Sequence, residues 1–234
     1  MRNIIISMIF LLTSLNANEV YATFNIEAKE SANLAFSSSG IIDEILVDVT
    51  SVVKKGDTLA VLQNDDLKAM VEISKVSLKY AKNDYERQKK VRTLIDKSQF
   101  DKYAFKYDNA KAELKYRESL LDKTVLKAPF NGEIYEKLVE VGDVVSGQMI
   151  TVSLKIQSKN RRKLVLEFDQ KYYKDVQIGD IFRYKLDGDE KEYEGKISKI
   201  YPYTDKKTRK IKAEVLTKDF IVGLFGDGFI ITNR

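Results

Sequence analysis

The side chains that could carry out chemistry in this chain lack the usual nucleophiles and soft metal ligands. Among its 234 residues there is no Cys and no His. Thiolate and imidazole metal sites, Cys nucleophiles and Ser-His-Asp triads are therefore excluded. An enzyme would have to rely on Lys or carboxylate groups, and no nucleophile with a partner base is recognisable. The sequence predicts a protein that is not an enzyme and has no cofactor.

Acidic and thioether side chains remain as candidates for ion binding. The segments "NDDL" (64–67) and "DGDE" (187–190) lack the D-x-[DN]-x-[DN]-G spacing of calcium loops. The first is better explained as a helix start, where carboxylates favour the N-terminal dipole, and the second as a hairpin turn. Soft copper or silver ions need Met or Cys ligands, and only Met70 and Met149 follow the N-terminal segment. We expect no metal site.

The N-terminal segment predicts export. Arg2 supplies a positive charge, Ile4 to Leu15 an apolar run and Ala17 a plausible cleavage position. The apolar run has about twelve residues, whereas a membrane-spanning helix needs about twenty. We therefore expect a signal peptide over 1–17 that is removed, with an uncleaved anchor as the alternative.

The basic balance of the chain does not indicate a nucleic-acid partner. The formal net charge is +5, but basic and acidic residues are interleaved, as in "AKNDYERQKK" (81–90). This pattern is typical of a solvated helix face rather than of a basic patch. We expect no nucleic-acid binding.

The segment 64–122 predicts a helical hairpin. It contains no Gly or Pro, and its apolar residues alternate spacings of four and three. A single helix of this length would be about 85 to 90 Å long, so an antiparallel pair is more economical. "DKSQFD" (96–101) offers the break, with Ser98 as the helix N-cap and Asp101 completing a capping-box-like turn. A plain coiled-coil spacer is the alternative. The expected seam comprises Leu67, Val71, Ser74, Leu78, Ala81, Tyr85, Tyr103, Tyr107, Ala110, Leu114 and Leu121.

Two stretches with period-two apolar patterns flank this hairpin and repeat each other. With Gly40 set on Gly132, apolar residues coincide at five pairs of positions within residues 40–62 and 132–152. Gly56 falls on Gly147 after an offset of one residue, and Thr50 stands where the second copy has Gly142, so we expect one turn to differ in shape. Each copy is too small to bury a face alone, and the two together are expected to close a flattened barrel. The coinciding pairs are Ile42/Ile134, Val47/Val139, Val49/Val141, Val52/Val144 and Val53/Val145.

The repeat resembles the two halves of a biotinyl/lipoyl domain, over 26–63 and 123–155. In carrier members of that fold, a Lys at the connecting turn is modified; here the helices replace that turn, so no modifiable Lys is expected. The remaining segment, 156–234, consists of short strands with turns. It predicts a small antiparallel β-barrel that takes one more strand from 19–25.

Split lipoyl halves around a hairpin, followed by a β-barrel and preceded by an export signal, resemble the periplasmic adaptor or membrane fusion protein family (HlyD-like) of tripartite efflux pumps. The most specific segments are "KAPFNGEI" (127–134), "VVKKGDTLAVL" (52–62) and "GKISKIYPYTDKKTRKIKAEV" (195–215). The resemblance singles out Pro129 and the barrel residues Gly195, Pro202, Asp205, Thr208 and Arg209.

The resemblance also implies partners and a place in the cell. It implies a periplasmic adaptor between an inner-membrane transporter of the RND type and a TolC-like outer-membrane duct, with self-association into a ring, a trimer or hexamer. The barrel would rest on the transporter. An adaptor of an ABC-type exporter is the close alternative, and an exported coiled-coil protein that bridges envelope layers is the alternative from another class. The family's fourth, membrane-proximal domain is expected to be missing.

Adaptors of this kind tend to carry Arg, then Leu, then Ser around the hairpin tip, and the corresponding residues here are Arg87, Val91 and Ser98. An exposed Arg can pair with carboxylates or helix-end carbonyls of a facing helix tip, and Val91 offers an apolar contact. Leu94 and Asp101 complete the expected contact set for the duct. A solvated Arg87 with Ser98 acting only as a cap is the alternative.

Overall fold

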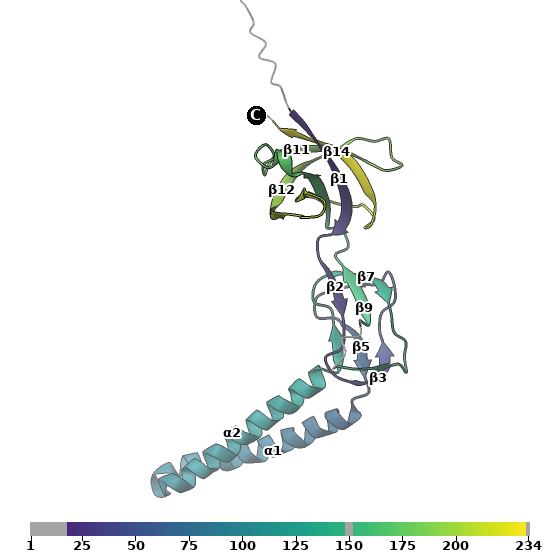
Figure 1. Ribbon diagram of the computed structural model, residues 1–234. Coiled ribbons are helices and arrows are strands. Elements are labelled where there is room, and N and C mark those ends of the chain that lie inside the picture. The colour runs from purple at the N-terminus through teal and green to yellow at the C-terminus, as the bar shows by residue number, and fades with distance from the viewer. Residues whose placement is uncertain (1–17, 148–151, 233–234) are drawn as a thin grey trace, which may run out of the picture. The chain divides into compact units, whose positions relative to one another are not determined.

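The computed structural model describes residues 18–147 and 152–232 (Figure 1). The signal peptide expected over 1–17, Met149 and part of the second repeat therefore lie outside the described residues. The chain divides into two compact units, one formed by 30–159 and the other by the segments on either side of it. The predicted fold class, mainly β with a long helical hairpin, is confirmed.

The first unit is a closed barrel of six antiparallel strands. Their order around the barrel is β1-β10-β13-β12-β11-β14. Along β1 the side chains of Val20, Ala22, Phe24 and Ile26 are buried while their neighbours face outward, as the period of two in a strand requires. The strands are β1 (Asn18–Ala28), β10 (Arg162–Asp169), β11 (Ile181–Leu186), β12 (Tyr193–Thr204), β13 (Lys210–Thr217) and β14 (Phe225–Thr232), with one short 3₁₀ helix, η2 (Gln170–Tyr172).

The boundaries of this barrel fall differently from the expected ones. Strand β1 continues to Ala28, which pairs with Arg162, so residues 26–28 belong to the barrel and not to the first lipoyl half. The reason is that the buried alternation of β1 continues through its end. At the other boundary, β9 (Leu154–Gln157) pairs within the second unit, and the barrel resumes only at Arg162.

The second unit contains a sandwich of two four-stranded sheets, ordered β2-β9-β7-β4 and β6-β5-β3-β8. Each sheet takes strands from both copies of the repeat, because β4 pairs with β7 and β8 pairs with β3. The equivalent residues Ile42 and Ile134 are both fully buried in the shared core. Neither copy therefore completes a sheet by itself. The strands are β2 (Ser31–Leu34), β3 (Gly40–Ile45), β4 (Val52–Val53), β5 (Thr58–Leu62), β6 (Val125–Lys127), β7 (Gly132–Lys137), β8 (Val144–Val145) and β9.

A helical hairpin leaves this sandwich between β5 and β6. It consists of α1 (Asp65–Lys90), the 3₁₀ turn η1 (Arg92–Leu94) and α2 (Lys97–Asp122), and the two long helices lie side by side in Figure 1. All the residues expected in the seam are buried or half-buried, and the most buried are small or β-branched. Small side chains at the contact let two helices approach closely. Neither helix combines the length and apolar character needed to cross a membrane.

The start of α2 corrects one expectation. Asp96, not Ser98, is the N-cap, and its carboxylate oxygen Oδ1 accepts the backbone N–H of Ser98 at 2.7 Å. Ser98 lies inside the first turn, so the expected capping-box-like turn with Asp101 does not form. An N-cap carboxylate satisfies a free N–H and also interacts favourably with the helix dipole, which explains why Asp96 takes the position.

Candidate functional site

The tip of the hairpin is a short, hydrogen-bonded turn. Helix α1 ends at Lys90, and the N–H of the C-cap residue Val91 is directed at the carbonyls of Gln88 and Lys89. The N–H of Leu94 then donates to the Val91 carbonyl at 2.9 Å, and Ile95 is extended before the Asp96 cap. Both helix ends are thus closed by local hydrogen bonds, and the turn does not depend on a partner for its shape.

The residues predicted to contact a duct lie at or near this tip. Leu94 has 83% of its surface exposed, and Val91, Ser98 and Asp101 are exposed as well. Because so much of the Leu94 side chain is in water, it contributes almost no buried apolar surface to the fold of its own chain. The structure thus places an exposed apolar residue beside polar ones at the end of the hairpin.

Arg87 lies one turn before the tip and is held by a local ion pair. Its guanidinium contacts the Asp84 carboxylate, which also lies 3.7 Å from Lys106 on α2. The Arg87 side chain remains mostly exposed. Arg87 itself is 73% exposed and Asp84 also faces Lys106, so Arg87 can turn to another acceptor without leaving the half-buried Asp84 carboxylate without a cationic neighbour.

An aromatic cluster lies between the two helices next to the tip. It was not predicted as a group from the sequence. The Tyr85 ring stacks on Tyr107 with centroids 5.3 Å apart, and it lies 5.5 Å from the Phe100 ring. The Arg92 guanidinium lies 4.5 Å from the centroid of Phe100. The aromatic spacing in the sequence was a usable signal for Tyr85 and Tyr107, but nothing local connects Arg92 with Phe100. These contacts join η1 to both helices and stiffen the tip.

The turns of the two lipoyl halves show what the repeated glycines do. Gly142 has φ of +92° and Thr50 has φ of +73°, so the two equivalent turns share one shape despite their different residues. In both turns an oxygen of the last residue accepts the first residue's N–H: Ser51 Oγ from Asp48 and the Asp143 carboxylate from Glu140. The expectation that one turn would differ is therefore wrong.

The other repeat residues have separate roles. A Cβ on Gly132 would come within 2.5 Å of the Gln157 carbonyl, so this glycine permits the close approach of β7 and β9. Gly56 has a positive φ, whereas Gly147, its expected counterpart, does not. Gly40 packs against Leu62, and Pro129 is exposed in the connection from β6 to β7. These positions shape the sandwich.

The barrel motif forms the hairpin between β12 and β13. The Asp205 carboxylate accepts the N–H groups of Lys207 and Thr208, and Arg209 follows with φ of +58°. These hydrogen bonds hold the pKa of Asp205 below its usual value, and the bond from Thr208 makes the largest contribution. Pro202 lies in a stretch where the pairing of β12 with β13 shifts register. A Cβ on Gly195 would overlap Val215.

The predicted site residues therefore fall into three separate groups. The hairpin tip is an exposed surface, whereas the repeat glycines and the barrel motif build turns and close strand contacts. Among the described residues, no cluster of three carboxylates is suited to hold a metal ion.

Comparison with known proteins decides the family. The family model described as the CzcB-like barrel-sandwich hybrid domain matches residues 30–154, which include the sandwich and its hairpin. The chain belongs to this family. No curated protein sequence matches the chain.

Solved structures share the fold of this CzcB-like protein along nearly its whole length. A MacA-MexA chimeric protein containing the Pseudomonas aeruginosa MexA α-hairpin domain matches with a TM-score of 0.84 and 20% identity, over 93% of this chain and 83% of the other. MacA from Actinobacillus actinomycetemcomitans matches with a TM-score of 0.76 and 19% identity, over 92% and 79%. The membrane fusion protein Spr0693 from Streptococcus pneumoniae R6 matches with a TM-score of 0.71 and 17% identity, over 92% of this chain and 99% of the other. The expected resemblance to membrane fusion proteins is confirmed at the level of family and fold.

Proposed function

We propose that this CzcB-like protein is the periplasmic adaptor of a tripartite efflux system, which links an inner-membrane RND transporter to an outer-membrane exit duct. The observation that carries the proposal is the hairpin tip, where Leu94 is 83% exposed on a turn that is closed by its own hydrogen bonds. The fold shared with a membrane fusion protein and with MacA supports it.

The tip is suited to meet the ends of helices in another protein. Leu94 and Val91 supply a small apolar centre, and Arg87, Ser98 and Asp101 supply polar groups around it. Interfaces commonly place an apolar anchor inside a polar rim. Arg87 would pair with carboxylates or carbonyl groups of the duct, and Asp84, its present partner, would keep Lys106 at 3.7 Å.

The remaining parts of the protein receive roles in the same proposal. The barrel contacts the transporter, and several copies associate through their sandwiches into a ring, a trimer or hexamer, because one copy cannot enclose a channel. The adaptor works by geometry and association rather than by catalysis. A bridging coiled-coil protein would need the hairpin but would have no use for the interleaved sandwich, so the sandwich favours the adaptor.

Co-purification of partners tests this proposal. The tagged chain is purified from membranes of its own cells, as the unaltered chain and as Leu94→Asp. Ile73→Asp serves as a matched control, since Ile73 is 70% exposed on α1 but far along the helix from the tip. We expect Leu94→Asp to lose the outer-membrane duct and keep the transporter, and Ile73→Asp to keep the duct. Retention of the duct by Leu94→Asp would contradict the assignment of the tip.

A further inference from the structure

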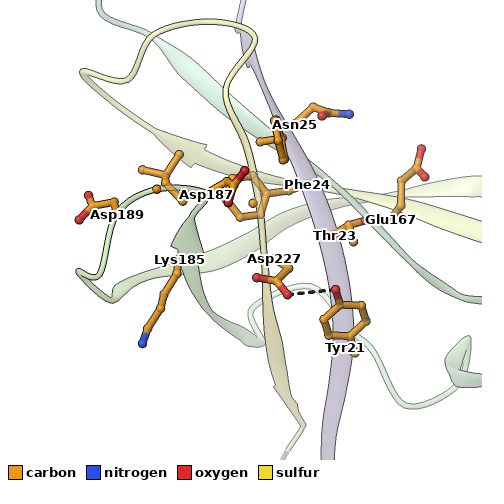
Figure 2. A pocket seen from close by; sticks show the side chains of 13 residues that line it. Tyr21, Thr23, Phe24, Asn25, Glu167, Lys185, Asp187, Asp189 and Asp227 are labelled. Atoms are coloured by element: carbon orange, nitrogen blue, oxygen red, sulfur yellow. Dashed lines mark hydrogen bonds between the residues drawn. The ribbon is translucent and has the colours of Figure 1, made fainter.

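A cavity in the barrel unit has no part in the contacts proposed for the hairpin tip. It has a volume of about 510 Å³ and lies where the outer side of β1 meets the end of β11 and the start of β14 (Figure 2). Pockets for small molecules commonly have volumes of roughly 300 to 1,000 Å³. Its size alone therefore permits a small organic ligand.

The floor of this cavity depends on a glycine. Gly226 lies between Phe24 and Leu186, and a Cβ there would come within 2.8 Å of the Phe24 ring and 2.1 Å of the Lys185 carbonyl. No side chain can fill this position, so the cavity reaches down to the edge of the Phe24 ring, which is itself only 2% exposed and belongs to the barrel core. The exposed aromatic surface of the cavity comes from Tyr21 and Phe225, with 51% and 57% of their surfaces exposed. The cavity thus offers aromatic surface that the fold leaves in water.

The charged groups around these rings are mostly negative. Asp187, Asp189 and Asp227 line the cavity together with one basic side chain, that of Lys185. Glu167 also lines it, but Lys210 and Lys212 pair with its carboxylate at 3.7 and 3.3 Å. Yet Lys185 Nζ pairs with Glu192 at 3.2 Å, and Figure 2 shows it pointing away from Asp227. No cationic side chain in the described ranges 18–147 and 152–232 lies within 4 Å of the carboxylates of Asp187 or Asp227.

Hydrogen bonds fix the positions of two lining side chains, those of Tyr21 and Asp189. The Tyr21 hydroxyl donates to Asp227 Oδ2 at 3.0 Å, and this hydrogen bond, more than burial, raises the pKa of Tyr21. The hydrogen bond holds the Tyr21 hydroxyl beside the Asp227 carboxylate. Asp189 accepts the N–H of Lys191 and the hydroxyl of Tyr193, and these bonds lower its pKa. Asp189 consequently remains charged in mildly acidic surroundings.

From this geometry we propose that the cavity binds a small organic cation, with an ammonium or phosphonium centre on an apolar body. A cation near aromatic faces is attracted by their quadrupoles, and the carboxylates of Asp187 and Asp227 supply opposite charge. A metal ion fits less well, because no three carboxylates in the described part of the chain are close enough to share one. The inference adds a ligand-binding function and does not depend on the proposed adaptor role.

Titration calorimetry with tetraphenylphosphonium on the purified full chain tests this inference. The tetraphenylborate anion has nearly the same shape and opposite charge, so it separates charge recognition from apolar contact without any variant. We expect one phosphonium to bind per chain, and tetraphenylborate to bind at least about tenfold more weakly. Equal binding of the two ions, or no binding of the phosphonium, would overturn the proposal.

Variants locate the site. Asp187→Asn with Asp227→Asn removes two charges and keeps the shapes of the side chains, and we expect the affinity for tetraphenylphosphonium to fall about tenfold or more. Tyr21→Leu should also weaken binding, since it removes a ring. The control pair Asp43→Asn with Asp108→Asn makes the same charge change at exposed positions outside the barrel. If the control pair weakened binding as much as the cavity pair, the assignment of the cavity would be wrong.

Discussion

The Asn64 side chain donates a hydrogen bond from Nδ2 to the Thr124 hydroxyl at 2.9 Å, although 60 residues separate them. Asn64 occupies the N-cap position of α1, where its side chain makes no capping hydrogen bond, and Thr124 follows the end of α2. Both residues are almost fully buried. The Thr124 hydroxyl in turn donates to the Leu121 carbonyl. This pair joins both helices at the point where they leave the sandwich.

Replacing Asn64 by Ala should therefore loosen the root of the hairpin. The variant leaves the buried Thr124 hydroxyl without its donor, which should lower the free energy of unfolding by about 1–3 kcal/mol. Denaturant titration followed by circular dichroism measures the change. Asn109→Ala on the exposed face of α2 is the control and should change stability little. Equal effects of the two substitutions would contradict the role of the buried pair.

The strained turn at Thr50 predicts that a glycine at this position would stabilise the protein. Its φ of +73° is unfavourable for a β-branched residue, whereas Gly142 holds the equivalent conformation without strain. Thr50→Gly should stabilise the protein by about 0.5–1 kcal/mol, after the greater chain entropy of glycine is included. The reciprocal change, Gly142→Thr, should destabilise it by about 0.5–1 kcal/mol, because the same strain and the same chain-entropy contribution apply with opposite sign. Thermal unfolding of both variants measures the pair, and a loss of stability in Thr50→Gly would refute the argument.

Acid should weaken the hairpin turn between β12 and β13. The pKa of Asp205 is lowered in the fold, chiefly by the N–H of Thr208 and then by that of Lys207. Because the folded value is below the unfolded one, the stabilisation is complete above about pH 4 and is lost as the pH falls through the folded pKa. The melting temperature of Asp205→Asn should lie below that of the unaltered chain at pH 6, and the gap should narrow toward pH 2.5. A gap that stays constant over this range would exclude the charge of Asp205 as the cause.

The aromatic support of the tip predicts a local effect. Phe100→Ala removes the ring that contacts Tyr85 and Arg92, so the backbone of η1 should exchange its amide hydrogens faster. Global stability should fall only modestly, since Phe100 is only half-buried. Hydrogen exchange followed by mass spectrometry measures this, with Phe105→Ala, an exposed ring on the same helix, as the control. Unchanged exchange at Arg92–Leu94 in Phe100→Ala would show that the ring does not stiffen the tip.

The sequence predicted the fold well where the pattern is local or repeated. The spacing of residues such as Val71 and Ala110 predicted the packed face of each helix, and the Gly40/Gly132 alignment predicted two halves of one sandwich. The family resemblance was likewise confirmed.

The errors arose where side chains compete or meet over long distances. Asp96 and Ser98 are both good caps, and only the path of the chain after Ile95 decides between them. The positive φ of Thr50 could not be predicted from the sequence, because β-branched residues rarely adopt this conformation. The Asn64–Thr124 pair and the cavity beside Asp227 bring together distant segments, and no periodicity reports such contacts. The contacts of Arg87, Val91, Leu94, Ser98 and Asp101 with a duct stay predictions.

The central claim, that the hairpin tip meets an outer-membrane duct, is tested most directly by cross-linking in intact cells. The chain has no Cys, so Ser98→Cys at the tip and Lys171→Cys on the barrel each provide a single exposed thiol. Partners captured by a thiol cross-linker are then identified by mass spectrometry. We predict that Ser98→Cys captures the duct and Lys171→Cys does not. Capture of only further copies of this chain from the tip, or capture of the duct from Lys171→Cys alone, would contradict the account.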